Sequence, residues 1–278
     1  MPSYDTPGAI TADLDFEVGY VRITATERAD TVVRVLPSDG SDENDVRVAE
    51  QTKVTYANGT LTVKGPRKRS LFGKHGSIDV AVDLPAGSRL RAASPIGHYT
   101  AEGPLGECRV RTSLGDLSFA QTGPANLRTG HGSVRVERVA GDAEIHGSGP
   151  IDLGEVTGTA TVKNGNGDTT VDEITGDLKV SAANGRITIG VAHASVEARS
   201  ANGAIRVHDV ARGVVRLQTA ADDVEVGVRK STAAWLDVTT RLGTVRNTLG
   251  AAEGPGASEE TVEIHARTGV GDIVIRRA

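Results

Sequence analysis

The sequence has very few cysteine and aromatic residues. It contains one Cys, one Trp, one Met, three Phe and four Tyr among 278 residues, against 34 Gly. The single thiol, Cys108, excludes an internal disulfide, so nothing in the thiols indicates an oxidising compartment. Any core must therefore consist of Val, Ile, Leu, Ala and Thr, which fits a narrow stack of strands better than a thick helical globule.

Long apolar runs and a strong charge of either sign are also missing. No run approaches the ~20 apolar residues of a membrane-spanning helix. The N-terminus, MPSYDTPGAITADLDF, lacks the basic start, apolar stretch and cleavage site of a secretory signal. The formal net charge of −5 argues against a nucleic-acid-binding footprint. We therefore expect a soluble, cytoplasmic protein that has no transmembrane segment and binds no nucleic acid.

A repeat organises most of the chain. Asn166-Gly167, Asn184-Gly185 and Asn202-Gly203 fall 18 residues apart. The repeat can be counted on one position, called the mark below, which lies two residues before the first inward apolar residue and is usually glycine. The marks are Gly76, Gly97, Gly115, Gly132, Gly149, Gly167, Gly185, Gly203, Asp222, Gly243 and Gly271. After each mark, apolar residues recur at +2, +4, +7, +11 and +13, and in the Gly149 repeat these are Ile151, Leu153, Val156, Ala160 and Val162.

This phase predicts two short strands per repeat, joined by corners that glycine permits. Each strand can bury its inward side chains only against the repeats above and below it. We therefore predict an all-β, single-stranded parallel β-helix, or β-solenoid, with about 18 residues per coil. A left-handed hexapeptide helix shares the period, but six-residue steps from Val171 give Asp177 and Ala183, so its inward aliphatic ladder is absent.

The N-terminal part departs from the repeat. Alternating apolar residues predict strands between Leu14 and Pro37, a short helix is expected at Asp45–Gln51, and Lys53–Lys64 predicts a hairpin around Asn58-Gly59. We expect residues 1–75 to form strands, a hairpin-containing cap and a basic loop that pack on the solenoid. Residues 76–278 are expected to form the solenoid repeats and a C-terminal cap, within one continuous domain.

The basic loop is the main candidate for interaction. Its cations surround two apolar residues, and the set is Lys64, Arg67, Lys68, Arg69, Leu71, Phe72 and Lys74. Such a loop suits a protein groove or a peripheral contact with an anionic membrane surface. Alternatively, the loop folds back and its two apolar side chains plug the open end of the first coil.

Other candidate positions have structural explanations. Asn166, Asn184 and Asn202 are expected to form a turn ladder, hydrogen-bonded along the stack. Trp235 is expected to cover a coil edge within a cap, and Gly250–Glu260 is expected to be a flexible acidic excursion. The seven His residues show no zinc-ligand spacing, and no phosphate-loop motif or pair of carboxylates on adjacent repeats is present. We therefore predict no catalytic residue, no metal and no cofactor.

The strings GNGDTTV, ANGRITI and TGVGDIVI, the LFG loop after the hairpin and the AAWLDVTT segment carry a resemblance. Over roughly Asp13 to Arg277 the chain resembles the bacterial β-strand-repeat family of candidate adhesins, a domain of unknown function that is similar to the head domains of autotransporter adhesins. The resemblance implies a right-handed parallel β-helix with no established catalytic residues.

These observations predict a non-catalytic scaffold or protein-interaction module that self-associates or binds a protein partner. Two alternatives stay open: a carbohydrate-binding or carbohydrate-active β-helix protein, and a surface adhesin.

Overall fold

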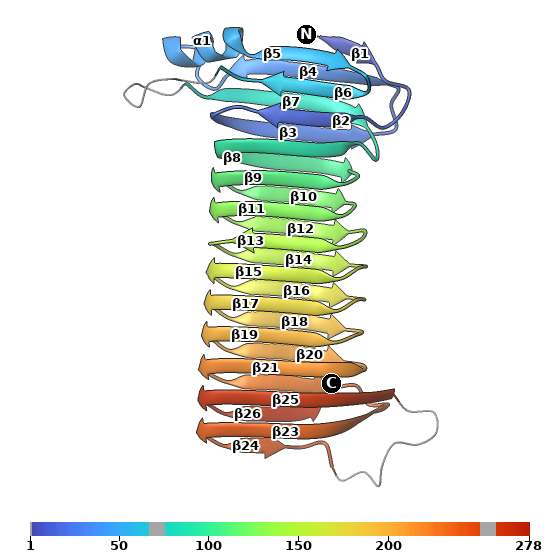
Figure 1. Ribbon diagram of the computed structural model, residues 1–278, viewed down its shortest axis with the longest axis vertical. Helices are drawn as coiled ribbons and strands as arrows, with labels where there is room; N and C mark the ends of the chain where they lie inside the picture. The colour runs from blue at the N-terminus through green and yellow to red at the C-terminus, as the bar shows by residue number, and fades with distance from the viewer. Residues whose placement is uncertain (1, 67–75, 251–259) are drawn as a thin grey trace. The chain divides into compact units, whose positions relative to one another are not determined.

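The computed structural model describes residues 2–66, 76–250 and 260–278 of the chain (Figure 1). The described chain forms two compact units, Met1–Ala140 and Gly141–Ala278, called unit 1 and unit 2 below. No helix of the described ranges combines the length and the apolarity needed to cross a membrane.

Unit 1 consists of two sheets that share one long strand. Its elements are β1 (Ser3–Asp5), β2 (Thr11–Asp15), β3 (Val18–Thr26), β4 (Asp30–Pro37), α1 (Glu43–Gln51), β5 (Lys53–Ala57), β6 (Thr60–Lys64), β7 (Ile78–Pro85), β8 (Arg89–Pro104), β9 (Cys108–Leu114), β10 (Leu117–Thr122), β11 (Ala125–His131) and β12 (Val134–Val139). One sheet runs β5–β6–β2–β8–β9–β11 and the other β1–β4–β7–β3–β8–β10–β12. The pairs β5–β6, β1–β4 and β4–β7 are antiparallel and the remaining pairs are parallel.

The N-terminal expectations agree with this part of the structure. The hairpin β5–β6 turns at Asn58 and Gly59, whose φ values of 50° and 72° suit a tight turn of two residues. Helix α1 starts two residues earlier than expected because the Asp42 side chain accepts the backbone N–H of Asn44 at 2.7 Å and caps the first turn. The helix packs against β4 and β7.

Unit 2 is parallel throughout. Its strands are β13 (Ala143–Gly147), β14 (Ile151–Val156), β15 (Ala160–Asn166), β16 (Thr169–Ile174), β17 (Leu178–Asn184), β18 (Ile187–Ala192), β19 (Val196–Asn202), β20 (Ile205–Val210), β21 (Gly213–Ala221), β22 (Val224–Val228), β23 (Thr232–Leu242), β24 (Val245–Asn247), β25 (Glu260–Val270) and β26 (Ile273–Arg277). One sheet runs β13–β15–β17–β19–β21–β25–β23 and the other β14–β16–β18–β20–β22–β26–β24.

The fold-class prediction is confirmed: the protein is a β-solenoid. Paired residues in successive coils stand 18 positions apart in the middle of unit 2, as for Val162 with Val180 and Ile187 with Ile205. In the Gly149 repeat the five positions predicted to point inward are at most 2% exposed. The period and the phase of the repeat therefore both follow from the pattern of apolar residues.

The order of the last two coils differs from the order in the sequence. The coil β25–β26 lies between β21–β22 and β23–β24, with Ile264 paired to Val215 on one side and to Leu236 on the other. Sequential counting of the marks predicts the opposite order, which is wrong. The inserted coil has the more apolar interior, because Ile273 and Ile275 are fully buried where the terminal coil carries Val245 and Asn247. The 28 residues between the last two marks let the chain skip one coil position and return.

Candidate interaction surfaces

The predicted basic loop lies mostly outside the described residues. Arg67, Lys68, Arg69, Leu71, Phe72 and Lys74 all fall in the undescribed range. Lys64 is described: it ends β6, is exposed, and lies opposite Lys53 of β5 and Asp15 of β2. Both interpretations of the loop, as a contact site and as a plug, therefore stay predictions.

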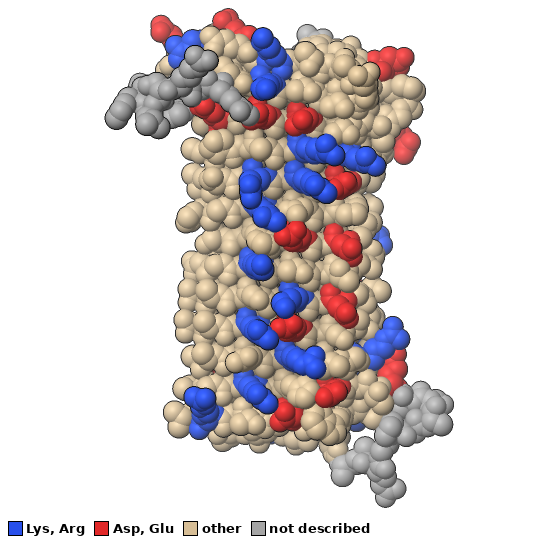
Figure 2. All heavy atoms as spheres, viewed as in Figure 1, with Lys and Arg blue, Asp and Glu red and all other residues tan. Residues whose placement is uncertain are grey.

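A basic face lies on the same sheet of unit 1 as Lys64. Arg91 pairs in register with Arg109, and Arg111 pairs with Arg128. Like charges directly opposite each other on neighbouring strands are unfavourable unless counter-charges lie nearby. Glu107 supplies one, at 2.8 Å from the Arg109 guanidinium. Figure 2 shows Lys and Arg side chains interleaved with Asp and Glu on the face in view. The arrangement offers several guanidinium groups to an anion.

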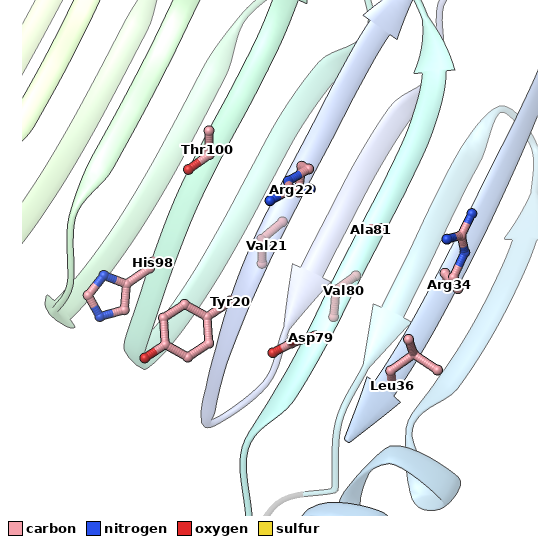
Figure 3. A pocket seen from close by; sticks show the side chains of 10 residues that line it. All are labelled: Tyr20, Val21, Arg22, Arg34, Leu36, Asp79, Val80, Ala81, His98 and Thr100. Carbon is pink, nitrogen blue, oxygen red and sulfur yellow. The ribbon is translucent and has the colours of Figure 1, made fainter. Parts of the chain in front are cut away.

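A hollow of about 290 Å³ opens on the outward face of the other sheet of unit 1 (Figure 3). Its lining residues are Tyr20, Val21, Arg22, Arg34, Leu36, Asp79, Val80, Ala81, His98 and Thr100. Ala81 of β7 lies in register between Arg34 of β4 and Arg22 of β3, so a methyl group separates two exposed guanidinium side chains. Tyr20 of β3 pairs in register with Asp79 of β7, and the Tyr20 side chain is 56% exposed.

An aromatic stack lies on one side of this hollow, and its His98 ring contacts Asp116. The Tyr20 ring stacks on the His98 imidazole, with centroids 4.9 Å apart and planes 14° apart. His98 Nδ1 lies 3.4 Å from Asp116 Oδ2. The backbone N–H and the hydroxyl of Ser133 donate to the Asp116 carboxylate, and with His98 they hold the pKa of Asp116 below its usual value. The lining of the hollow thus combines an exposed aromatic ring, two guanidinium groups and the Asp79 carboxylate, which suits a polar ligand.

The three Asn residues of the repeat lie at one corner of unit 2. Asn166 pairs with Asn184, and Asn184 pairs with Asn202. The Asn202 side-chain amide donates to Asn184 Oδ1 at 3.0 Å. The positive φ at these corners belongs to the following glycines, and Gly185, for example, has a φ of 122°. The exposed side chains of Asn184 and Asn202 therefore contact each other along the corner, and Asn166 lies in register with Asn184.

A buried polar column was missed by the sequence analysis. Inward Thr hydroxyls donate to the backbone carbonyl of the mark in the preceding coil: Thr129 to Gly115 at 2.9 Å, and Thr219 to Gly203 at 3.0 Å. Asn164 does the same with its amide, toward Gly149 at 3.0 Å. A signal was present in the sequence, because a polar residue recurs three positions before many of the marks.

The terminal coil of unit 2 has an open side. Within the described ranges, β23 pairs with β25, and no strand pairs with its other edge. The inward Leu236 and Val238 are half-buried there, whereas Ile264 in the next coil is fully buried. Leu242 at the corner is 68% exposed. Among the described residues, the coil therefore presents a strand edge without a pairing partner next to incompletely covered apolar side chains.

Trp235 lies on the outward side of this open coil. It is 58% exposed and meets the His265 ring edge-on, with centroids 5.5 Å apart. It does not cover the coil edge, so its expected role as a cap is wrong. His265 also lies between two carboxylates, at 3.2 Å from Asp237 and 2.7 Å from Glu263. The hydrogen bond from His265 and the nearby Arg267 lower the pKa of Asp237.

The remaining groups with potential chemistry are dispersed. Among the residues that the structure describes, no cluster of three or more His, Cys, Asp or Glu is placed to hold a metal ion. Cys108 is fully buried, and its burial raises the pKa of the thiol to about 12, which suits a small core residue rather than a nucleophile.

The chain was compared with known proteins. Three solved structures are similar to this chain over nearly their whole length. A candidate cell adhesion protein from Clostridium sporogenes ATCC 15579 is 13% identical, with a TM-score of 0.25 over 100% of this chain and 98% of that one. A candidate adhesin from Bacteroides fragilis NCTC 9343 is 12% identical, with a TM-score of 0.34 over 99% and 95%. A candidate adhesin from Parabacteroides merdae ATCC 43184 is 12% identical, with a TM-score of 0.42 over 98% and 94%.

Sequence comparison points to one family. The family model described as Toastrack DUF4097 matches residues 11–276. No match was found among curated protein sequences.

Proposed function

Because the chain belongs to the Toastrack DUF4097 family, a domain family of unknown function, we propose its role from its own surfaces. It is a non-catalytic β-solenoid scaffold or protein-interaction module, and its open terminal coil receives a strand from a protein partner. The observation that supports this proposal is the edge of β23 that faces away from β25, with which no strand of the described residues pairs.

An added strand would complete this coil in two ways. It would pair with the backbone N–H and C=O groups along an 11-residue strand. It would also cover Leu236 and Val238, whose burial is incomplete. Natural proteins usually protect such an edge with lysines, prolines or a short strand. The strand β1, which ends one sheet of unit 1, has three residues, whereas β23 is long and has Trp235 and Leu242 exposed.

Affinity capture from native cells tests this proposal. The wild type is compared with an edge variant, Leu242→Lys with Val245→Lys, and with a control, Leu114→Lys, which alters an exposed leucine of unit 1. The proposal expects a partner that the wild type and the control retain and the edge variant loses. Equal capture by all three overturns it.

A fourth variant separates the edge from the predicted basic loop. Leu71→Ala with Phe72→Ala removes the two apolar side chains of that loop. If this variant loses the partner while the edge variant keeps it, the loop is the contact site and the edge proposal is wrong.

Carbohydrate binding is a second candidate, supported by the hollow of unit 1. Tyr20 offers an exposed aromatic ring, and Asp79 and Arg22 offer groups that can bond hydroxyl and carboxylate oxygens. A glycan array with the wild type and Tyr20→Ala tests it. Binding that the variant loses supports this candidate, and an array without binding excludes it. Turnover of a bound glycan would contradict the non-catalytic role.

The site of action is tested by fractionation of native cells. We propose a cytoplasmic location, and the alternative is a surface adhesin. Recovery of the protein only in the cytosol excludes the adhesin, and recovery at the cell surface excludes the cytoplasmic proposal.

A further inference from the structure

We propose that the strand received by the open terminal coil is β23 of a second copy of this chain. The two strands pair antiparallel across a two-fold axis that passes through Thr239. This inference rests on the proposed function, because it requires the β23 edge to be a protein-docking surface. It names the partner and fixes the register of the pairing.

The charges of β23 favour this register. In an antiparallel pair, directly opposite residues share a face, so the outward residues of one copy face the outward residues of the other. With Thr239 on the axis, Asp237 lies opposite Arg241 of the second copy, and the symmetry repeats this pair. With Asp237 on the axis, two carboxylates oppose each other, and with Arg241 on the axis, two guanidinium groups do. Asp237 and Arg241 lie on the outward side of the coil, and Arg241 is exposed.

The inward face fits the same register. Leu236 lies opposite Leu242 of the second copy, and Val238 lies opposite Thr240. These inward side chains are the ones that the solenoid leaves half-buried or exposed. Pairing would bury them between two coil ends, and the removal of this apolar surface from water stabilises the association.

The same register also places Trp235 opposite a glycine and brings the two β24 strands together. Trp235 lies opposite Gly243 of the second copy, where an aromatic ring can cover the exposed glycine backbone. Gly243 forms the corner four residues after Thr239 and four before Asn247. The same axis therefore passes near Asn247 and brings β24 beside β24 of the second copy. One symmetry operation thus pairs both open edges of the coil.

Charge reversal tests the register directly. Arg241→Asp alone places two carboxylates opposite each other, and Asp237→Arg alone places two guanidinium groups opposite each other. We expect each variant to weaken self-association by at least about tenfold. Mixing the two variants restores opposite charges at both positions, so the mixture should form a heterodimer when neither variant forms a homodimer. Sedimentation velocity over a range of concentrations measures all four samples.

A crosslink supplies a test that does not depend on charge. The Thr239→Cys variant places a thiol on the axis, next to its own symmetry mate, and should form an intermolecular disulfide under mild oxidation. The Thr188→Cys variant, with its thiol on the outward side of the inner strand β18, is the control and should stay monomeric. Because Asp237 also contacts His265 and Arg267, circular dichroism of each variant checks that the solenoid is folded.

The outcomes separate this inference from the proposed function. A wild type that is monomeric at every concentration overturns the second copy as partner, while capture of another protein through the edge would still support the proposed function. A dimer that neither single charge variant weakens overturns this edge and register. Restoration in the mixture, together with the Thr239→Cys crosslink, supports the inference.

Discussion

Gly185 stacks so closely on Gly167 that a Cβ atom added to Gly185 would overlap the Gly167 carbonyl oxygen. Its φ of +122° is also a conformation that side chains with L chirality rarely adopt. Gly203 has the same relationship to Gly185. Glycine is therefore required at these corners by space as well as by torsion, which explains why it marks the repeat.

The Gly185→Ala variant should be strongly destabilised. The added methyl group must displace the backbone of the preceding coil, and the torsion is strained as well. We expect a loss of about 2–4 kcal/mol in the free energy of unfolding, seen as a lower urea midpoint. The control is Gly165→Ala in unit 2, where the nearest atom to the new Cβ is 3.5 Å away, an ordinary contact. Similar midpoints for the two variants would contradict the packing argument.

The Thr219→Val variant should lose a buried hydrogen bond at nearly constant volume. The Thr219 hydroxyl donates to the Gly203 and Ala221 carbonyls at 3.0 and 2.9 Å, and its residue is 2% exposed. Valine leaves these acceptors with fewer donors, so we expect a loss of about 1–3 kcal/mol. Thr188→Val, on the outward side of β18, is the control and should be nearly neutral. A neutral Thr219→Val would show that the column adds no stability.

The repeat could be predicted because its evidence is local. In each coil, the glycine mark and the inward apolar residues, such as Ile151 and Leu153, indicate which positions face the core. The polar column does not follow from the apolar pattern, because Thr and Asn side chains occupy its inward positions. Thr112, Thr129 and Thr219 were visible at a constant offset from their marks.

The order of the last coils could not be predicted from the repeat. The coils β23–β24 and β25–β26 both follow the period of the repeat. The period therefore does not indicate which of the two stacks directly on the coil β21–β22. The choice depends on a comparison between them: Ile273 and Ile275 stabilise an inner position better than Val245 and Asn247 do.

The hollow of unit 1 could not be predicted either, because distant segments form it. Tyr20 and His98 stack although 78 positions separate them, and Arg34 reaches the same place on an antiparallel strand. Only the pairing of β3 with β8 and of β4 with β7 brings them together. Those pairings break the 18-residue rule, so the repeat carried no information about them.

Asp116 should make stability depend on acid pH. Its folded-state pKa is lowered, mainly by the backbone N–H of Ser133, so the ionised form is favoured in the folded protein. This contribution is complete above the ordinary pKa of Asp, about 3.8, and is lost as the pH falls through the lower folded-state value. Asp116 is largely exposed, so solvent screening keeps the effect below about 1 kcal/mol.

The Asp116→Asn variant measures this contribution. Urea unfolding at pH 7 should show the variant slightly less stable than wild type, and the difference should shrink as the pH approaches 3. Ser133→Ala is the matched comparison: it removes the hydroxyl but keeps the backbone N–H, so its effect should be smaller. A difference that is constant between pH 7 and pH 3 would mean that the carboxylate charge is not the cause.

Cys108 should resist alkylation until the solenoid unfolds. The thiol is fully buried, it lies 3.5 Å from the Gly106 carbonyl, and its pKa is raised to about 12. At pH 8 its thiolate fraction is then roughly a thousandfold below that of an ordinary thiol, and the thiolate is the reactive form. Iodoacetamide labelling of native wild type should therefore be very slow and should rise at the urea concentration where unit 1 unfolds. The outward, partly exposed thiol of the Thr188→Cys variant is the internal standard. Equal rates at the two positions in the native protein would show that the core around Cys108 opens far more often than its packing implies.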